Sequence, residues 1–239
     1  MIKFFRNIRK SLLDEGKTAN YLKYAIGEIV LVVIGILIAL QINNWNDQLK
    51  INDQEIKLLN EMIQNLDANI LTLEAMNYEQ VEHIQGIDSI LYHFKNGTTS
   101  ETLKQYFTKT VHTETLNLSY ATFETIKTIG FDIIKNDRIR LAIMELFEVS
   151  FSHQEKTITE VASPIYFQNI LGWMLNNRQY LDSIFDSNEF RNDKNFNFIK
   201  NYIESKRIWK SDIIKNNIKL IKETKEVESL IKAYLDKKK

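Results

Sequence analysis

The sequence predicts an all-α protein: one N-terminal transmembrane helix that continues into an extracytoplasmic helical bundle with two long antiparallel helices. First, the run from Ile29 to Leu40 has no polar side chain and, with its flanks, approaches the ~20 residues that a helix needs to cross a bilayer. Second, the 239 residues include one proline and seven glycines, fewer than turn-rich all-β folds require. Third, 26% charged residues predict that the part outside the membrane is a water-soluble bundle.

Composition also excludes several classes of site. The chain has no cysteine, which rules out disulfides, thiolate nucleophiles and cysteine-ligated metals. The formal net charge is zero, but residues 1–23 hold six basic residues against two acidic ones, so the remainder is acidic. An acidic body gives no support for nucleic acid as a partner.

Residues 1–20 are predicted to form a basic amphipathic segment on the cytoplasmic side. Ile2, Phe5, Ile8 and Leu12 recur at three-to-four-residue spacing, with basic residues between them. This pattern is typical of helices that lie in a membrane interface beside anionic headgroups. The alternative is a flanking tail whose cations matter only for topology.

The transmembrane helix is assigned to residues 21–43, and residues 44–239 to an exported helical domain. Five Lys or Arg residues precede the span and Lys23 lies at its first turn, whereas Lys50 is the first that follows it, so the positive-inside rule places the N-terminus in the cytoplasm. A cleavable signal peptide would begin in the same way, but no A-x-A-like site follows the apolar run. We therefore expect a retained signal-anchor, with the lipid bilayer as its first partner.

Small residues in the span are candidates for helix–helix contact. Gly27 and Gly35 are eight residues apart and share a helical face. Gly35 and Ala39 form a small-xxx-small pair, which lets two membrane helices approach closely. Such pairs also arise by chance, so dimerisation through this face is one of two interpretations.

Two further residues mark the ends of the span. Glu28 is ionisable and either snorkels toward the headgroups, pairs with Lys23, or makes a polar contact with another membrane helix. Trp45 is expected to anchor the other end at the membrane–water interface, because its ring is amphipathic.

Two stretches resemble a known family. MIKFFRNIRKSLLDEGK, followed by YLKYAIGEIVLVVIGILIALQINNWND, closely resembles the opening of a bacterial domain-of-unknown-function family. YATFETIKTIGFDIIKNDRIRLAI resembles the internal TFE, K and G signature of that family, with Ile-Gly at Gly130 in place of the usual Ser-Gly. The resemblance implies a single-pass membrane protein of Gram-negative bacteria with a helical part after the anchor. Together with the predicted orientation, it places the chain in the inner membrane and the helical domain in the periplasm.

A long helix is predicted from Asn46 to Phe94, where apolar residues recur at steps of three and four. The spacing is that of a coiled coil or a helical bundle, and no helix breaker separates this segment from the span. Asn77 and Gln80 interrupt the apolar stripe. They indicate a polar layer, a kink, or a switch of the stripe to Met76 and Val81.

Shorter helices and a second long helix account for the rest of the chain. After the stop at Asn96-Gly97, we expect a short helix capped at Thr99 or Ser100, an irregular stretch over 110–118, and a helix capped by Ser119 and ended by Gly130. A longer helix is predicted from Asn136 or Asp137 to about Ala162. Two shorter helices follow, one after Ser163-Pro164 and one over RQYLDSIF, and a final helix runs from about Asn195 to Lys237. The buried stripe of the 137–162 helix is expected to continue through Ser150, His153 and Thr157. The buried face of the final helix is expected to hold Phe198, Tyr202, Trp209, Ile213, Leu220, Val227, Ile231 and Tyr234.

No constellation of residues predicts catalysis or metal binding. The four histidines form no i, i+4 pair and no Glu-x-x-His pattern. Glu79, Glu82 and His83 share a helical turn, but such clusters are more often a solvated charged face. Ser150 and His153 could be nucleophile and base, yet a buried polar layer is the commoner outcome. We therefore assign no catalytic residue, no cofactor and no metal, and expect that the protein is not an enzyme.

Two functional hypotheses remain. The first is a non-enzymatic, membrane-tethered interaction or scaffold module that self-associates or binds another membrane protein, because an anchor and long helices occur without a catalytic constellation. The alternative is a sensory or ligand-binding periplasmic bundle, in which the continuous helix passes a signal through the membrane to a partner.

Overall fold

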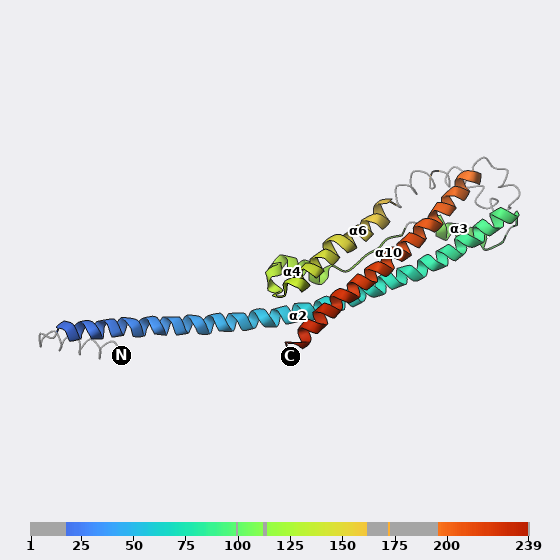
Figure 1. Cartoon of the computed structure of the whole chain (residues 1–239). Helices are drawn as coiled ribbons and strands as arrows, with labels where there is room; N and C mark the ends of the chain where they lie inside the picture. Colours follow the sequence, from blue (N-terminus) through green and yellow to red (C-terminus); the bar gives the residue numbers. More distant parts are fainter. Residues whose placement is uncertain (1–17, 99, 112–113, 162–171, 173–195, 239) are drawn as a thin grey trace. The chain divides into compact units, whose positions relative to one another are not determined.

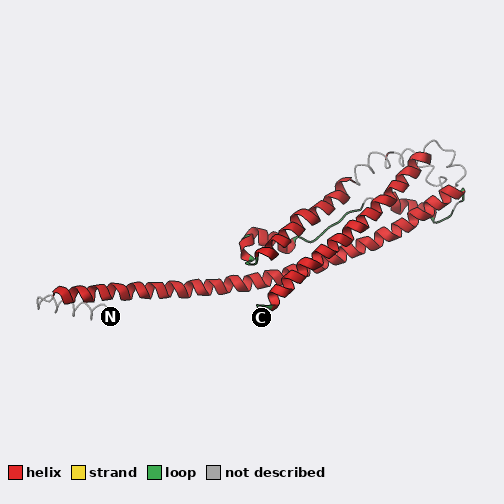
Figure 2. Cartoon of the chain, in the orientation of Figure 1, coloured by secondary structure: helices red, strands yellow, loops and turns green. Residues whose placement is uncertain are grey.

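The computed structural model describes residues 18–98, 100–111, 114–161, 172 and 196–238, and these contain helices and no strand (Figure 2). This confirms the predicted all-α class. The amphipathic segment at the N-terminus and the predicted helices after Ser163-Pro164 and over RQYLDSIF lie outside the described residues. The chain divides into two compact units, residues 1–54 and residues 55–239, and each is described by itself.

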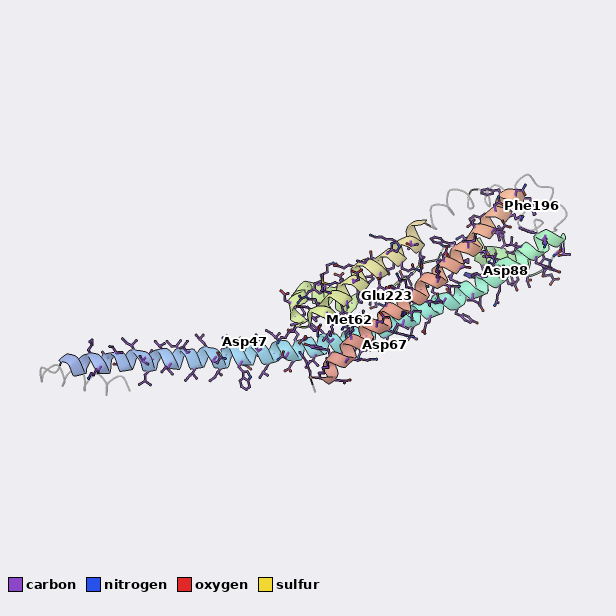
Figure 3. All side chains as sticks on the ribbon, in the orientation of Figure 1. Asp47, Met62, Asp67, Asp88, Phe196 and Glu223 are labelled. Atoms are coloured by element: carbon purple, nitrogen blue, oxygen red, sulfur yellow. The ribbon has the colours of Figure 1, made fainter. Side chains whose placement is uncertain are left out.

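The described part of the first unit is helical and apolar. Helix α2 runs Thr18–Asn96, and its early part holds the predicted span. No residue of its most apolar stretch is buried, and the side chains before Asp47 project outward around the helix (Figure 3). Within the residues described, α2 is the one helix long and apolar enough to cross a membrane.

The second unit is built on two long antiparallel helices, as predicted. The part of α2 after residue 54 lies alongside α10, Phe196–Asp236 (Figure 1). Residues early in this part of α2 pair with residues at or just after the end of α10, and later residues of α2 pair with earlier ones of α10. The pairs include Glu55 with Lys238, Asn77 with Asn217, and Asp88 with Arg207.

A buried carboxylate joins three segments at one end of this unit. Glu55 is fully buried and accepts hydrogen bonds from the backbone N–H of Lys135 at 2.9 Å, from the Tyr234 hydroxyl at 2.9 Å, and from the Lys238 ammonium. Burial raises the pKa of Glu55, but the hydrogen bonds from these three donors outweigh burial and bring the pKa below its ordinary value. Glu55 therefore links α2, the 134–136 connection and the C-terminal end of α10.

Apolar packing closes the other end of the helix pair. Helix α3, Leu103–Val111, adds Leu103 and Phe107 to a core that α2 and α10 supply with Ile87, Ile90, Phe94, Ile199, Tyr202 and Ile203. Gly86 lets α3 approach closely, because an added Cβ would lie 3.0 Å from the Tyr106 ring. Helix α2 ends, as predicted, at Asn96 before Gly97, whose φ of 65° is the left-handed conformation that favours glycine.

Helix α4 corrects one predicted cap. It spans Ala121–Ile129 and ends at Gly130, as expected, but Ser119 does not cap its N-terminus. The Ser119 hydroxyl donates instead to Asn65 Oδ1 at 3.3 Å, and the same oxygen accepts the backbone N–H of Thr122 at 3.0 Å. The cap therefore comes from a neighbouring helix, which sequence spacing within one segment does not reveal.

The helical stretch after η1, Phe131–Ile133, begins as predicted. Asn136 Oδ1 accepts the Ile139 N–H at 3.2 Å and caps the start of α5, Asp137–Met144. The stretch then continues as η2, Glu145–Phe151, α6, Ser152–Lys156, and η3, Thr157–Val161, of which η2 and η3 are π-helical.

The π-helical segments overturn the predicted end of the buried stripe. A π-helix bonds residue i to i+5, so each turn takes more residues than an α-turn and shifts the side chains that follow. The buried residues are Phe151, Gln154 and Ile158. Each lies one position after a residue that was expected to be buried, namely Ser150, His153 and Thr157. Phe151 joins an aromatic core in which Phe123 and Phe147 stack at 4.8 Å.

One expected buried position on α10 is corrected. Phe198 is 44% exposed, and the neighbouring Ile199 is fully buried in its place. On α2 the buried residues include Met62, which is labelled in Figure 3, and also Asn69 and Ile90. Of the three interpretations of the Asn77–Gln80 interruption, the structure supports the polar layer, because Gln80 is fully buried and Asn77 accepts a hydrogen bond from Asn217. The switch of the stripe is half met, since Met76 is buried but Val81 is 44% exposed.

The substitution Asn65→Ala is expected to lower the free energy of unfolding by about 1–2 kcal/mol, because α4 loses the side chain that caps it. Ser119→Ala removes only a donor to Asn65 and should cost less than about 0.5 kcal/mol. Thermal unfolding of the full chain in mild detergent, followed by circular dichroism, measures both. A larger loss for Ser119→Ala than for Asn65→Ala would restore the cap predicted from sequence.

Candidate functional site

Ionisable side chains meet inside the second unit, where the helix pair would ordinarily bury apolar residues. We call Gln80, His83, Glu114, Lys206 and Lys210 the polar cluster. Gln80 and His83 come from α2, Lys206 and Lys210 lie one turn apart on α10, and Glu114 lies in the non-helical stretch before α4. The cluster thus draws on three segments that are far apart in sequence.

Lys210 is the centre of the cluster and is fully buried. Its ammonium lies 3.2 Å from Gln80 Oε1, 3.2 Å from His83 Nδ1, and in direct contact with Glu114 Oε1. Burial lowers the pKa of Lys210, and the charge and hydrogen bond of Glu114 act in the opposite direction. These three acceptors account for the three N–H donors of the ammonium.

Lys206 shares the same surroundings without the same hydrogen bonds. It is 6% exposed, and its ammonium lies 6.0 Å from the centre of the Tyr202 ring. Among the residues that the structure describes, its Nζ has no hydrogen-bond partner. Burial lowers the pKa of Lys206, and nearby Lys210 lowers it further, whereas Glu114 raises it. Two cationic side chains therefore face one carboxylate.

Other buried N–H groups lie on the residues of this region. Gln80 Nε2 and Trp209 Nε1 are buried without an acceptor in the described part of the chain, and Glu114 Oε2 is a buried acceptor without a donor there. Buried polar groups are nearly always hydrogen-bonded, because burial without a partner is costly. The polar cluster and its surroundings thus contain buried N–H donors that have no acceptor among the described residues.

A chain of amide hydrogen bonds adjoins the cluster. Gln154 Nε2 donates to Asn217 Oδ1 at 2.7 Å, and Asn217 Nδ2 donates to Asn77 Oδ1 at 2.9 Å. These bonds connect α6, α10 and α2 through side chains whose hydrogen bonds are directed at one another. Polar pairs of this kind fix which residues of two helices lie opposite each other.

The predicted charged face at Glu79, Glu82 and His83 is divided by the structure. Glu79 and Glu82 are exposed, in agreement with a solvated face, whereas the His83 side chain is 20% exposed and contacts Lys210. Among the described residues no group of three potential ligands could hold a metal ion.

The Ser150 and His153 hypothesis gains no hydrogen bond. Both residues line a pocket of about 350 Å³ together with Glu145, Gln154, Glu223 and their neighbours; Glu223 is labelled in Figure 3. His153 is exposed, and no hydrogen bond joins its ring to the Ser150 hydroxyl within this described pocket. Ser150 and His153 therefore lie beside Gln154 of the amide chain and do not form a buried polar layer of their own.

The membrane-contact candidates all lie in the first unit. An added Cβ at Gly27 or Gly35 would meet nothing within 4 Å, and Ala39 is exposed. Glu28 is half-buried, and Trp45 is 64% exposed.

Sequence reasoning found part of the polar cluster. Gln80 interrupts the predicted apolar stripe, but the buried face predicted for the final helix omits Lys206 and Lys210. Their signal was available: Lys206, Lys210, Asn217 and Thr224 continue the steps of three and four between Ile203 and Ile231. Lysine is almost never fully buried without a partner, so the pattern alone favoured exposed positions for them.

Comparison with models of known protein families gives a match. A model described as "Family of unknown function (DUF6090)" matches residues 28–202. No curated protein and no solved structure matches the chain.

His83 gives the second unit a pH dependence with a defined sign. Burial lowers the pKa of His83, Lys210 and Lys109 lower it further, and Glu114 and Glu79 raise it. The unfolded chain therefore binds a proton near the ordinary pKa of 6.5, whereas the folded chain binds it only at lower pH. Acidification from about pH 7.5 to 5 is expected to lower the free energy of unfolding through this residue.

Chemical denaturation of the full chain in detergent across that pH range measures the effect. His83→Gln should flatten the slope, and His153→Gln, at an exposed position, serves as the matched control. An unchanged slope in His83→Gln would contradict the assignment.

Proposed function

This chain belongs to the family of unknown function DUF6090, and from that premise we propose that it is a single-pass membrane protein whose helical domain acts by binding rather than by catalysis. The proposed location is the bacterial inner membrane, with the N-terminus in the cytoplasm and residues 44–239 in the periplasm. The apolar stretch of α2 and the excess of basic residues before it support this topology.

The polar cluster is the observation that carries a binding function. A fully buried Lys210 and a nearly fully buried Lys206 are expensive in an interior that helix packing alone would fill with apolar side chains. Stability gives no reason to retain them, because well-packed apolar residues usually serve as well or better. The cluster thus favours the sensory or ligand-binding hypothesis, with a small polar ligand as the expected partner.

Helix α2 connects this binding role with the membrane. It supplies Gln80 and His83 to the polar cluster, and the same helix contains the apolar stretch. A ligand that changes the contacts of Lys210 would act directly on α2. Because a conformational response requires differential binding to two states, the signal is proposed to pass to a partner that contacts the membrane helix.

A scaffold role is the second candidate. Its support is the open face at Gly27 and Gly35, which is continuous in spacing with Ala39 and would admit a second membrane helix. Glu28 would then contact another membrane helix rather than the headgroups. A homo-oligomer or another membrane protein is the proposed partner in this case.

The topology can be tested cleanly because the natural chain has no cysteine. A membrane-impermeant maleimide is expected to label the Asp212→Cys variant in cells whose outer membrane alone is permeabilised, since Asp212 is exposed on α10. The Lys10→Cys variant should be labelled only after the inner membrane is broken. Labelling in the opposite order would reverse the proposed orientation.

The binding function predicts that some small polar molecule stabilises the full chain. We expect hits from a polar-metabolite library to raise the thermal midpoint of the wild type and of Lys222→Met, an exposed-lysine control, but not of Lys210→Met. Hits that stabilise all three chains equally would move the binding site away from the polar cluster. A library without hits, together with cross-linked oligomers in cells, would favour the scaffold role.

A further inference from the structure

We propose that the Lys206 side of the polar cluster is an anion-binding site that takes a small monoanion carrying a hydrogen-bond donor, such as a hydroxycarboxylate. This inference rests on the proposed binding function and adds the ligand class. It starts from the charges of the cluster, in which two lysines share the buried carboxylate of Glu114, while the exposed Glu79 acts on Lys210 from outside the cluster.

Lys210 is not the group that would hold the ligand. Its ammonium already contacts Gln80 Oε1, His83 Nδ1 and Glu114 Oε1, and it is fully buried. Because these acceptors match its three N–H donors, a ligand would have to displace one of them. Lys210 instead fixes the position of Glu114 and of the Gln80 amide.

Lys206 is the group with unused binding capacity. It is buried to the same degree as a core residue, yet in the part of the chain that is described its Nζ donates to no acceptor. The Tyr202 ring at 6.0 Å offers a weak cation–π contact, which does not replace the hydration of a buried ammonium. A negatively charged oxygen beside Nζ would balance the charge and accept the hydrogen bond.

Other buried polar atoms of this unit define the rest of the ligand, and one of them belongs to Trp209, which follows Lys206 by three positions on α10. Gln80 Nε2 and Trp209 Nε1 are buried donors without an acceptor among the described residues, so the ligand should present further acceptor oxygens. Glu114 Oε2 is a buried acceptor of the same kind, and its negative charge opposes a dianion. A carboxylate with a hydroxyl group satisfies both requirements, since the carboxylate accepts and the hydroxyl donates.

The experiment uses the full chain in mild detergent and follows thermal unfolding by circular dichroism. Sodium glycolate is the principal probe, sodium acetate lacks its hydroxyl donor, inorganic phosphate tests a dianion, and sodium chloride sets equal ionic strength. We expect about 50 mM glycolate to raise the midpoint of the wild type by roughly 5 °C relative to chloride, with smaller rises for acetate and phosphate.

Lys206→Met should abolish the rise, because it removes the charge while keeping an unbranched side chain. Lys222→Met, an exposed lysine on the same helix, should keep it. A second measurement uses the wild type, so that it does not depend on the folding of Lys206→Met. Glycolate should shift the indole N–H resonance of Trp209, which the Trp209→Phe variant assigns, and chloride should not.

The proposal is overturned if glycolate and chloride give the same midpoint and the same indole resonance, or if Lys206→Met responds like the wild type. Ethylammonium chloride separates this failure from that of the binding function. A rise with that cation in place of the anions would reject the ligand class and leave a small-ligand site in the cluster. No rise with any probe or library compound would reject both.

Discussion

The structure of the second unit depends on one constraint: a polar group buried between α2 and α10 is costly unless a partner of complementary type meets it. The helix pair is long, and its buried positions recur at steps of three and four. A polar residue at one of these positions could reach solvent only if the helix rotated, and that rotation would also expose the apolar residues on the same face. Asn77, Asn217 and Gln154 meet the constraint with one another. Lys210 meets it only because α2 and the stretch before α4 both supply acceptors to it.

The same constraint explains how the smaller helices are held. Asn65 of α2 caps α4 through its Oδ1, and Asn69 of α2 exchanges hydrogen bonds with the backbone of Ser119 at 2.6 and 3.1 Å. Glu55 does the same for the 134–136 connection. Side chains of α2 therefore satisfy backbone groups of segments that have no strand or long helix of their own. Removing one such side chain leaves a buried backbone group unpaired, which is costlier than losing an apolar contact of similar area.

The class and the long elements could be predicted from sequence because they rest on local periodicity. The ends of α2 and α10, the Gly130 terminus and the Asn136 cap all follow from residues within a few positions of the feature. Whatever depends on a distant partner could not be predicted. Ser119 has the right residue type for a cap, but Asn65, more than fifty residues away, supplies it. The shift at Phe151 and Gln154 arises from π-helical hydrogen bonding, for which the sequence carries no recognised pattern.

The polar cluster is a further case of the same limit. The spacing of the buried face of α10 includes Lys206 and Lys210. Because burying a lysine is costly, the sequence alone does not predict that these two side chains are buried unless their acceptors are known. Those acceptors lie 96 to 130 residues away in the chain. Periodicity identifies the helix face, and only tertiary contacts show which polar residues belong on it.

The bond between Glu55 and Lys238 also sets an order of events during synthesis. The two residues are 183 positions apart, so this end of the antiparallel pair cannot close until synthesis has passed Lys238. Closing so long a loop is slow, because its entropic cost precedes the contacts that offset it. Until the unit has folded, Leu59, Leu66 and Leu73 of α2, which are fully buried in it, are open to solvent. The nascent domain therefore passes through an aggregation-sensitive stage, and an anchor that keeps neighbouring chains apart in a bilayer would protect it then.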